Sequence, residues 1–149
     1  MTSITLVIEE EKWRAVRGLQ ARLKRAAALA LSSARRKGAL TILLSNDKKL
    51  KALNRDFRGK DKPTNVLSFP ADAGDYLGDV AIAYGVTSKE ARASGKKLID
   101  HATHLAVHGV LHLIGHDHET RRDAKIMEPL EVRILGKLGI ADPYAVDIP

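Results

Sequence analysis

Residues 101–118 read HATHLAVHGVLHLIGHDH and contain all six histidines of the 149-residue chain. At about 100° per residue on a helix, the first four of these histidines fall within an arc of roughly 80°. Apolar residues fill most of the remaining circumference. We therefore expect a buried helix over residues 97–114, with one histidine stripe that lines a cleft.

The spacing of three histidines predicts a metal site at the end of this helix. His108 and His112 are four residues apart, so their imidazoles project from one face and can reach one ion at about 2.1 Å. Gly115 can adopt a positive φ and turn the chain back, which would bring His118 to the same ion. Three nitrogen ligands with one open position are typical of a catalytic zinc site rather than a structural one.

The residue that follows His108 limits the reactions that this metal site could catalyse. A similar histidine spacing occurs in metzincin proteases, but their general base is a glutamate directly after the first histidine. Gly109 stands at that position here, which disfavours a peptidase. His101 and His104 are expected at the rim of the cleft or behind the ligands, and His116 is expected to point elsewhere.

Composition indicates one soluble globular domain over residues 1–149. The chain is 44% hydrophobic and 29% charged, and it has no cysteine, which excludes a disulfide scaffold and a cysteine nucleophile. Its longest apolar runs are far shorter than the roughly 20 residues of a membrane span. We expect no membrane association and a cytoplasmic location, whereas the oligomeric state is not readable.

The charge balance favours a polyanionic partner. Twenty-five Lys and Arg residues face eighteen Asp and Glu residues, and the sequence pI is about 9.8. Nucleic acid is the first expectation for such an excess. Aromatic residues make up only 4% of the chain, so phosphate contacts rather than base stacking should dominate RNA binding.

Periodicity predicts an α/β chain of the α+β type, with a small mixed sheet of about four strands and helices packed on it. The metal site would lie at the end of the buried central helix. Strands are expected at residues 4–8, 40–44, 66–69 (closed by Pro70) and 79–84, and loops at 57–65 and 71–78. Helices are expected at residues 12–36, 46–56, 88–95, 97–114 and 120–138, the last interrupted near Glu128 because Pro129 lacks an amide hydrogen.

Three separated blocks resemble one known family. HGVLHLIGHDH at residues 108–118, LNRDFRGKDKPTNVLSFP at 53–70 and LGDVAI at 77–82 are similar to the signature of the YbeY endoribonucleases. The resemblance implies a zinc-dependent endoribonuclease, specific for single-stranded RNA, that binds one Zn²⁺ per chain through His108, His112 and His118. It also implies action in ribosomal RNA maturation at the 16S rRNA 3′ end, partnership with the small ribosomal subunit, and ribosome quality control.

Phosphate recognition is expected in the segment that follows residue 57. The resemblance implies a functional arginine at Arg58, whose planar guanidinium can bind a phosphate through two donors. Lys60 and Lys62 are further candidates for the same substrate-binding track. A zinc ion can lower the pKa of a bound water and stabilise charge on phosphoryl oxygens, but the sequence leaves open whether water or the RNA 2′-hydroxyl attacks.

Two other classes of function remain open. The chain could be a metallohydrolase of another substrate, but Gly109 and the excess of basic over acidic residues disfavour this. It could also be a non-catalytic, zinc-stabilised ribosome assembly factor. In that case metal removal would lower stability, and binding would depend on the number of Lys and Arg residues and fall steeply with salt.

Overall fold

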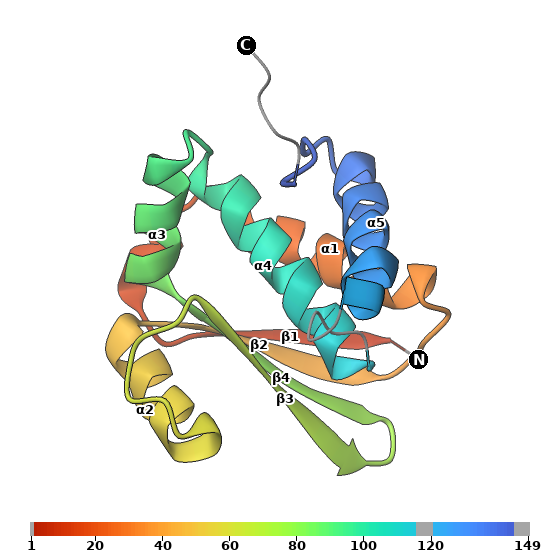
Figure 1. Cartoon of the computed structure of the whole chain (residues 1–149), viewed down its shortest axis with the longest axis horizontal. Helices are drawn as coiled ribbons and strands as arrows, with labels where there is room; N and C mark the ends of the chain where they lie inside the picture. Colours follow the sequence, from red (N-terminus) through yellow and green to blue (C-terminus); the bar gives the residue numbers. More distant parts are fainter. Residues whose placement is uncertain (1, 116–120, 145–149) are drawn as a thin grey trace.

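A four-stranded mixed sheet forms the centre of the molecule. The computed structural model describes residues 2–115 and 121–144. The strands are β1 (Ser3–Ile8), β2 (Ala39–Ser45), β3 (Val66–Ala73) and β4 (Tyr76–Ala83), in the order β1-β2-β4-β3. β2 runs parallel to β1 and β4, whereas β3 and β4 form an antiparallel hairpin at one edge (Figure 1). The predicted α/β class and the mixed sheet are confirmed.

Helices cover both faces of this sheet because its central strands bury side chains on both sides. The helices are α1 (Leu19–Ser33), α2 (Asp47–Arg58), α3 (Tyr84–Ala93), α4 (Leu98–Leu113) and α5 (Arg121–Lys137). Ile42, Val80 and Ile82 belong to the main core with α1, α4 and α5. Along β4, Ala81 and Ala83 alternate with Val80 and Ile82 and therefore face the other way. With Leu67 of β3 and Leu50 of α2 they form a smaller core on the opposite face (Figure 1).

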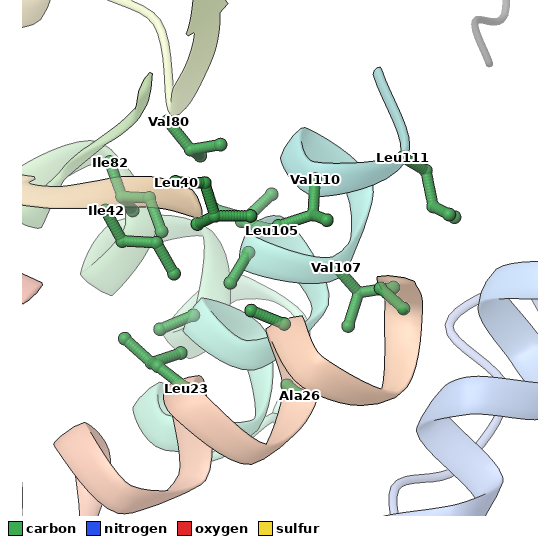
Figure 2. Packing of buried hydrophobic residues seen from close by; sticks show 14 of the residues in the cluster. Leu23, Ala26, Leu40, Ile42, Val80, Ile82, Leu105, Val107, Val110 and Leu111 are labelled. Atoms are coloured by element: carbon green, nitrogen blue, oxygen red, sulfur yellow. The ribbon is translucent and has the colours of Figure 1, made fainter. Parts of the chain in front are cut away.

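The central helix α4 is buried as the sequence predicts. It lies across one face of the sheet, and the close-up in Figure 2 shows Leu105, Val107 and Val110 among the side chains of α1, β2 and β4. These residues are at most 4% exposed. The helix ends near Leu113, and Gly115 follows with a φ of 100°, as expected for a residue that turns the chain.

The expected helix over residues 12–36 is wrong in its first third. A short 3₁₀ helix, η1 (Glu11–Ala15), precedes α1, and Gly18 separates them with a φ of 77°. Trp13 explains the break, because its indole is 1% exposed and its Nε1 donates a hydrogen bond of 2.9 Å to the Ser45 carbonyl. The break accompanies the packing of this indole against the end of β2.

The hairpin differs from the expected strand and loop. β3 continues past Pro70 to Ala73, and β4 begins at Tyr76, so only residues 74–75 of the expected 71–78 loop form the turn. Proline is tolerated because β3 is an edge strand that does not need every amide. α3 also begins earlier than predicted, at Tyr84.

The predicted interruption of the last helix is also wrong. α5 runs through Pro129 from Arg121 to Lys137. Pro129 is exposed, while Met127 and Ile134 are fully buried on the opposite side and hold the helix against the core. Burial of these side chains outweighs the missing hydrogen bond. None of the helices in the described part of the chain combines the length and hydrophobicity that a membrane crossing requires.

Candidate active site

The histidine stripe of α4 lines a cavity. His101, His104 and His108 border a space of about 480 Å³, together with residues of α3, the start of β3 and the C-terminal segment. His112 lies one turn beyond, with its ring centroid 4.5 Å from that of His108. Two imidazoles therefore meet at the end of α4, as the spacing predicts. His118, the predicted third ligand, lies outside the described residues, as do His116 and Asp117.

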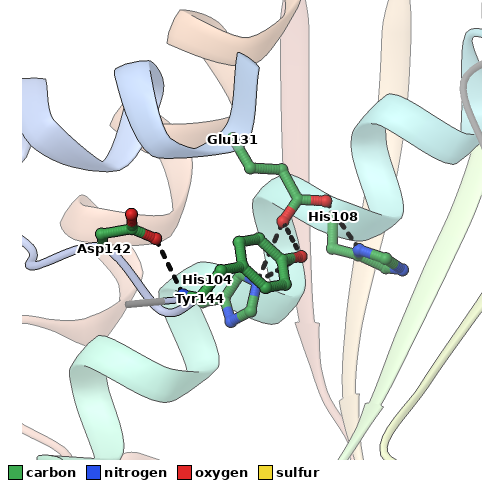
Figure 3. Close-up of polar contacts among 5 residues, drawn as sticks. All are labelled: His104, His108, Glu131, Asp142 and Tyr144. Carbon is green, nitrogen blue, oxygen red and sulfur yellow. Dashed lines mark hydrogen bonds and ion pairs between the residues drawn. The ribbon is translucent and has the colours of Figure 1, made fainter. Parts of the chain in front are cut away.

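A buried carboxylate from α5 stands behind this stripe. Glu131 is fully buried, and its Oε1 accepts a hydrogen bond of 2.8 Å from His108 Nδ1. Its Oε2 accepts from His104 Nε2 at 3.0 Å and from the Tyr144 hydroxyl at 2.5 Å (Figure 3). Burial alone would raise the pKa of Glu131, but the hydrogen bonds outweigh it and lower the pKa to about 2. Glu131 is thus an anion at neutral pH.

The segment after α5 places Tyr144 in contact with His104 and Glu131. Its ring meets the edge of the His104 ring at a centroid distance of 5.7 Å, and its amide donates to Asp142 Oδ1 at 2.8 Å. Burial and the neighbouring Glu131 carboxylate raise the pKa of the Tyr144 phenol. The hydroxyl therefore keeps its proton and donates a hydrogen bond to Glu131.

The donor set at this site could hold a metal ion. His104, His108 and Glu131 offer ligand atoms within 4.8 Å of one another, and the rings of His108 and His112 are adjacent. Imidazole nitrogen and carboxylate oxygen are both common zinc ligands. In a tetrahedral zinc site, however, ligand atoms lie about 3.3 Å apart. The separations of 2.8 and 3.0 Å from Glu131 are those of hydrogen bonds, so in this structure Glu131 is a hydrogen-bond partner of the two histidines.

A second carboxylate binds the first histidine of the stripe. Glu90 of α3 accepts a hydrogen bond of 2.9 Å from His101 Nε2 and one of 3.1 Å from Asn65 Nδ2. Burial lowers the pKa of His101, and this effect outweighs the opposing hydrogen bond to Glu90. Asn65 in turn accepts from the Val66 amide at 2.7 Å, so the start of β3 is tied to α3 and α4.

The predicted basic residues gather in a neighbouring cavity of about 390 Å³. Arg58, Lys60 and Lys62 line it together with Asn54. Arg58 belongs to the last turn of α2 and not to the expected loop, because the helix continues until Gly59 adopts a φ of 70°. Asn54 Nδ2 donates to the Lys62 carbonyl at 2.9 Å and holds the following segment beside the helix.

The two cavities adjoin. Asn65 and Glu90 line both of them, so the basic cavity and the histidine cavity meet at the start of β3 and the face of α3, and we call the two cavities together the groove. Positive charge lies at one end of this groove, and the histidine stripe lies at the other. Residues 58–62 and the histidine stripe, far apart in the sequence, thus become parts of one surface.

Comparison with known proteins assigns the family. The family model "Endoribonuclease YbeY" matches residues 7–139. This chain belongs to the YbeY endoribonuclease family. An "Endoribonuclease YbeY" of Rhodopseudomonas palustris strain BisA53 is 48% identical, covering 94% of this chain and 88% of the relative. One from Maricaulis maris is 40% identical, covering all of this chain and 96% of the relative.

A solved structure supports the fold. The solution structure of TM1509 from Thermotoga maritima is similar to this chain with a TM-score of 0.57 and 22% identity, over 96% of this chain and 99% of that chain. Membership of the YbeY family makes this chain a nuclease, a hydrolase of phosphodiester bonds. The recognised family is confirmed.

Sequence reasoning missed two residues of this YbeY site. Glu131 and Tyr144 are 23 and 36 positions beyond His108, in segments without a recognisable motif. One signal was available for Glu131: together with Met127, Ile134 and Leu138 it follows helical spacing along the buried stripe of α5. A charged residue at such a core position needs buried partners. No comparable signal marks Tyr144.

Proposed function

We propose that this chain is a zinc-dependent endoribonuclease for single-stranded RNA, with one zinc ion per chain held by His108, His112 and His118. The observation that carries the proposal is the groove that joins the basic cavity to the histidine cavity. An extended RNA strand can lie along it with one phosphate near Arg58 and the scissile bond at the histidines. The grouping of these residues on one surface supports a substrate with repeated negative charge.

Each part of the groove has a distinct role in this proposal. Arg58 binds and orients a phosphate through its guanidinium, and Lys60 and Lys62 extend the positive charge along the strand. His108, His112 and His118 would hold a zinc ion, which would supply Lewis acidity that lowers the pKa of a bound water and stabilises charge on the phosphoryl oxygens. The attacking group, water or the 2′-hydroxyl of the RNA, stays unassigned.

Ribosomal RNA is the substrate we propose. The family resemblance and the formal net charge of +7 support a role in ribosomal RNA processing, at the 16S rRNA 3′ end. The same resemblance supports partnership with the small ribosomal subunit and ribosome quality control, which imply action in the cytoplasm. These partners follow from the family rather than from a contact in the groove.

Cleavage of a single-stranded ribosomal RNA fragment tests the proposal. The wild-type protein, with its zinc content measured, is compared with His112→Ala, Arg58→Ala and Arg55→Ala. We expect His112→Ala to lose bound zinc and cleavage, and Arg58→Ala to keep zinc but cleave at least 10-fold more slowly. Arg55→Ala is the matched control, because Arg55 lies on the same helix but is exposed, pairs with Asp56 at 3.0 Å and does not line the groove.

The outcomes separate this proposal from its alternatives. Equal cleavage by wild type and His112→Ala would point to a contaminating ribonuclease and contradict the metal site. Zinc and RNA binding without cleavage by any variant would favour the ribosome assembly factor. Loss of cleavage in Arg58→Ala with RNA affinity retained would argue against that alternative.

A further inference from the structure

Glu131 is a charged side chain in a place where a charge is costly. It is fully buried between α4 and α5, in the same stripe of α5 as Met127 and Ile134. A buried carboxylate is retained only when several hydrogen bonds replace its lost hydration. Among the described residues, three donors bind it, and two of them are imidazoles of the histidine stripe. This position calls for a role other than packing.

The hydrogen bonds determine where His108 carries its proton. Glu131 Oε1 lies 2.8 Å from His108 Nδ1, while Oε2 receives His104 and Tyr144; a carboxylate oxygen in this geometry accepts from a ring N–H, which places the His108 proton on Nδ1. The lone pair of neutral His108 is then on Nε2. Figure 3 shows the His108 ring with Nδ1 directed at Glu131 and the opposite end of the ring directed away from it. The ring of His112 lies 4.5 Å from that of His108.

The other two donors immobilise the carboxylate. His104 Nε2 and the Tyr144 hydroxyl both bind Oε2, and His108 Nδ1 binds Oε1. Tyr144 comes from the segment beyond α5, and the His104 ring packs against it edge-on. Rotation of the carboxylate would break these contacts, so the orientation of His108 is coupled to the C-terminal segment.

We propose that Glu131 is a positioning residue for the metal site, and that Tyr144 holds it in place. Glu131 keeps His108 in the Nδ1–H tautomer, so that Nε2 is the atom that binds the ion. This inference rests on the proposed function, in which His108 and His112 hold zinc. Carboxylates behind metal-binding histidines orient the ring and increase its basicity, and their loss typically weakens metal binding 10–100-fold.

Zinc affinity of the full-length protein measures this role directly. Competition with a chromophoric chelator at pH 7 is applied to wild type, Glu131→Gln, Tyr144→Phe and Glu90→Gln, and circular dichroism checks the fold. We expect Glu131→Gln to bind zinc 10–100-fold more weakly and Tyr144→Phe to show a smaller loss in the same direction. Glu90→Gln is the matched control, because Glu90 binds the His101 imidazole in the same way on the same stripe. The zinc affinity of the Glu90→Gln variant should stay within 2-fold of wild type.

The tautomer of His108 supplies a readout that needs no metal. Long-range ¹H–¹⁵N correlation spectra of the zinc-free protein should show His108 protonated at Nδ1 and His104 protonated at Nε2. In Glu131→Gln the preference of His108 for Nδ1 should weaken. An Nε2–H tautomer of His108 in the wild type would overturn the inference, whatever the zinc affinity.

The controls distinguish failure of the inference from failure of the proposed function. Unchanged zinc affinity in Glu131→Gln, with loss of zinc in His112→Ala, would overturn the positioning role and leave the proposed function intact. Zinc retained in His112→Ala but lost in both Glu131→Gln and His104→Ala would make Glu131 a ligand and overturn both. If Glu131→Gln does not fold, Tyr144→Phe decides, because it removes one hydroxyl and keeps the carboxylate. Unchanged affinity and tautomer in that variant would contradict the proposal.

Discussion

At the residue scale, Gly109 explains how α4 comes close enough to the sheet to carry the site. A Cβ at this position would lie 2.5 Å from Val80 Cγ1 and 3.2 Å from Ser68 Oγ. Ser68 Oγ also donates a hydrogen bond of 2.8 Å to the Gly109 carbonyl. The position that holds the general base in metzincin proteases thus faces the sheet here and has no room for a carboxylate. Steric crowding therefore disfavours a peptidase of that kind independently of the residue type.

Gly109→Ala should destabilise the protein. The added methyl group has to displace the short side chain of Val80, which has little freedom to move. Overpacking of this kind costs about 1–3 kcal/mol of unfolding free energy. Urea unfolding followed by circular dichroism measures the change. Gly136→Ala is the control, because Gly136 is an exposed position of α5 where an added Cβ would meet no other atom within 4 Å, and alanine there should stabilise by about 0.5–1 kcal/mol. Equal effects of the two substitutions would contradict the close approach of α4.

At the element scale, α5 shows packing prevailing over local propensity. The helix continues through Pro129 although proline removes one helical hydrogen bond. Its buried side chains, among them Met127, Glu131 and Ile134, need the register that only a continuous helix provides. The same continuity places Glu131 opposite His104 and His108, so an interruption at Glu128 would have separated α5 from the site.

Pro129→Ala should therefore raise the stability of the fold. Restoring the amide and removing the ring clash is worth about 3 kcal/mol in a regular helix. Greater freedom of the unfolded chain offsets up to about 1 kcal/mol of this gain. We expect a net increase of about 2–3 kcal/mol in the unfolding free energy, measured by urea titration, with zinc binding unchanged. A decrease would show that the proline supplies a bend that α5 needs.

At the scale of the whole molecule, the groove is assembled from elements that belong to different parts of the fold. The end of α2 packs on one face of the sheet, whereas α4 packs on the other, and the first residues of β3 connect them at the edge (Figure 1). Asn65 and Glu90 lie where the two cavities meet. This arrangement allows one strand of nucleic acid to contact both ends of the groove.

RNA affinity should depend on salt through this groove. For single-stranded nucleic acid, each phosphate contact adds about 0.7 to the slope of log affinity against log salt concentration. In the non-cleaving His112→Ala background, Arg58→Ala should therefore lower the slope by about 0.7, and Arg55→Ala should leave it unchanged. Fluorescence anisotropy with a labelled single-stranded RNA between 50 and 300 mM salt measures both. The same slope in both variants would show that Arg58 does not contact a phosphate of the bound RNA.

The amino-acid sequence by itself determined the features that depend on neighbouring residues. The burial and extent of α4, the histidine stripe and the approach of His108 to His112 follow from helical spacing, because residues three and four apart share one face. The family and the basic residues Arg58, Lys60 and Lys62 were also readable from local blocks of sequence. These features need no knowledge of the contacts between distant segments.

Only the tertiary structure decided which distant segments complete the site. Glu131 and Tyr144 reach the histidines because α5 packs beside α4 and the C-terminal segment returns over it. Trp13 interrupts the first expected helix, and Pro129 fails to interrupt the last, for the same kind of reason. In each case, burial and hydrogen bonds between residues far apart in the chain outweigh the preference of a few neighbouring residues, and such contacts exist only in the folded molecule.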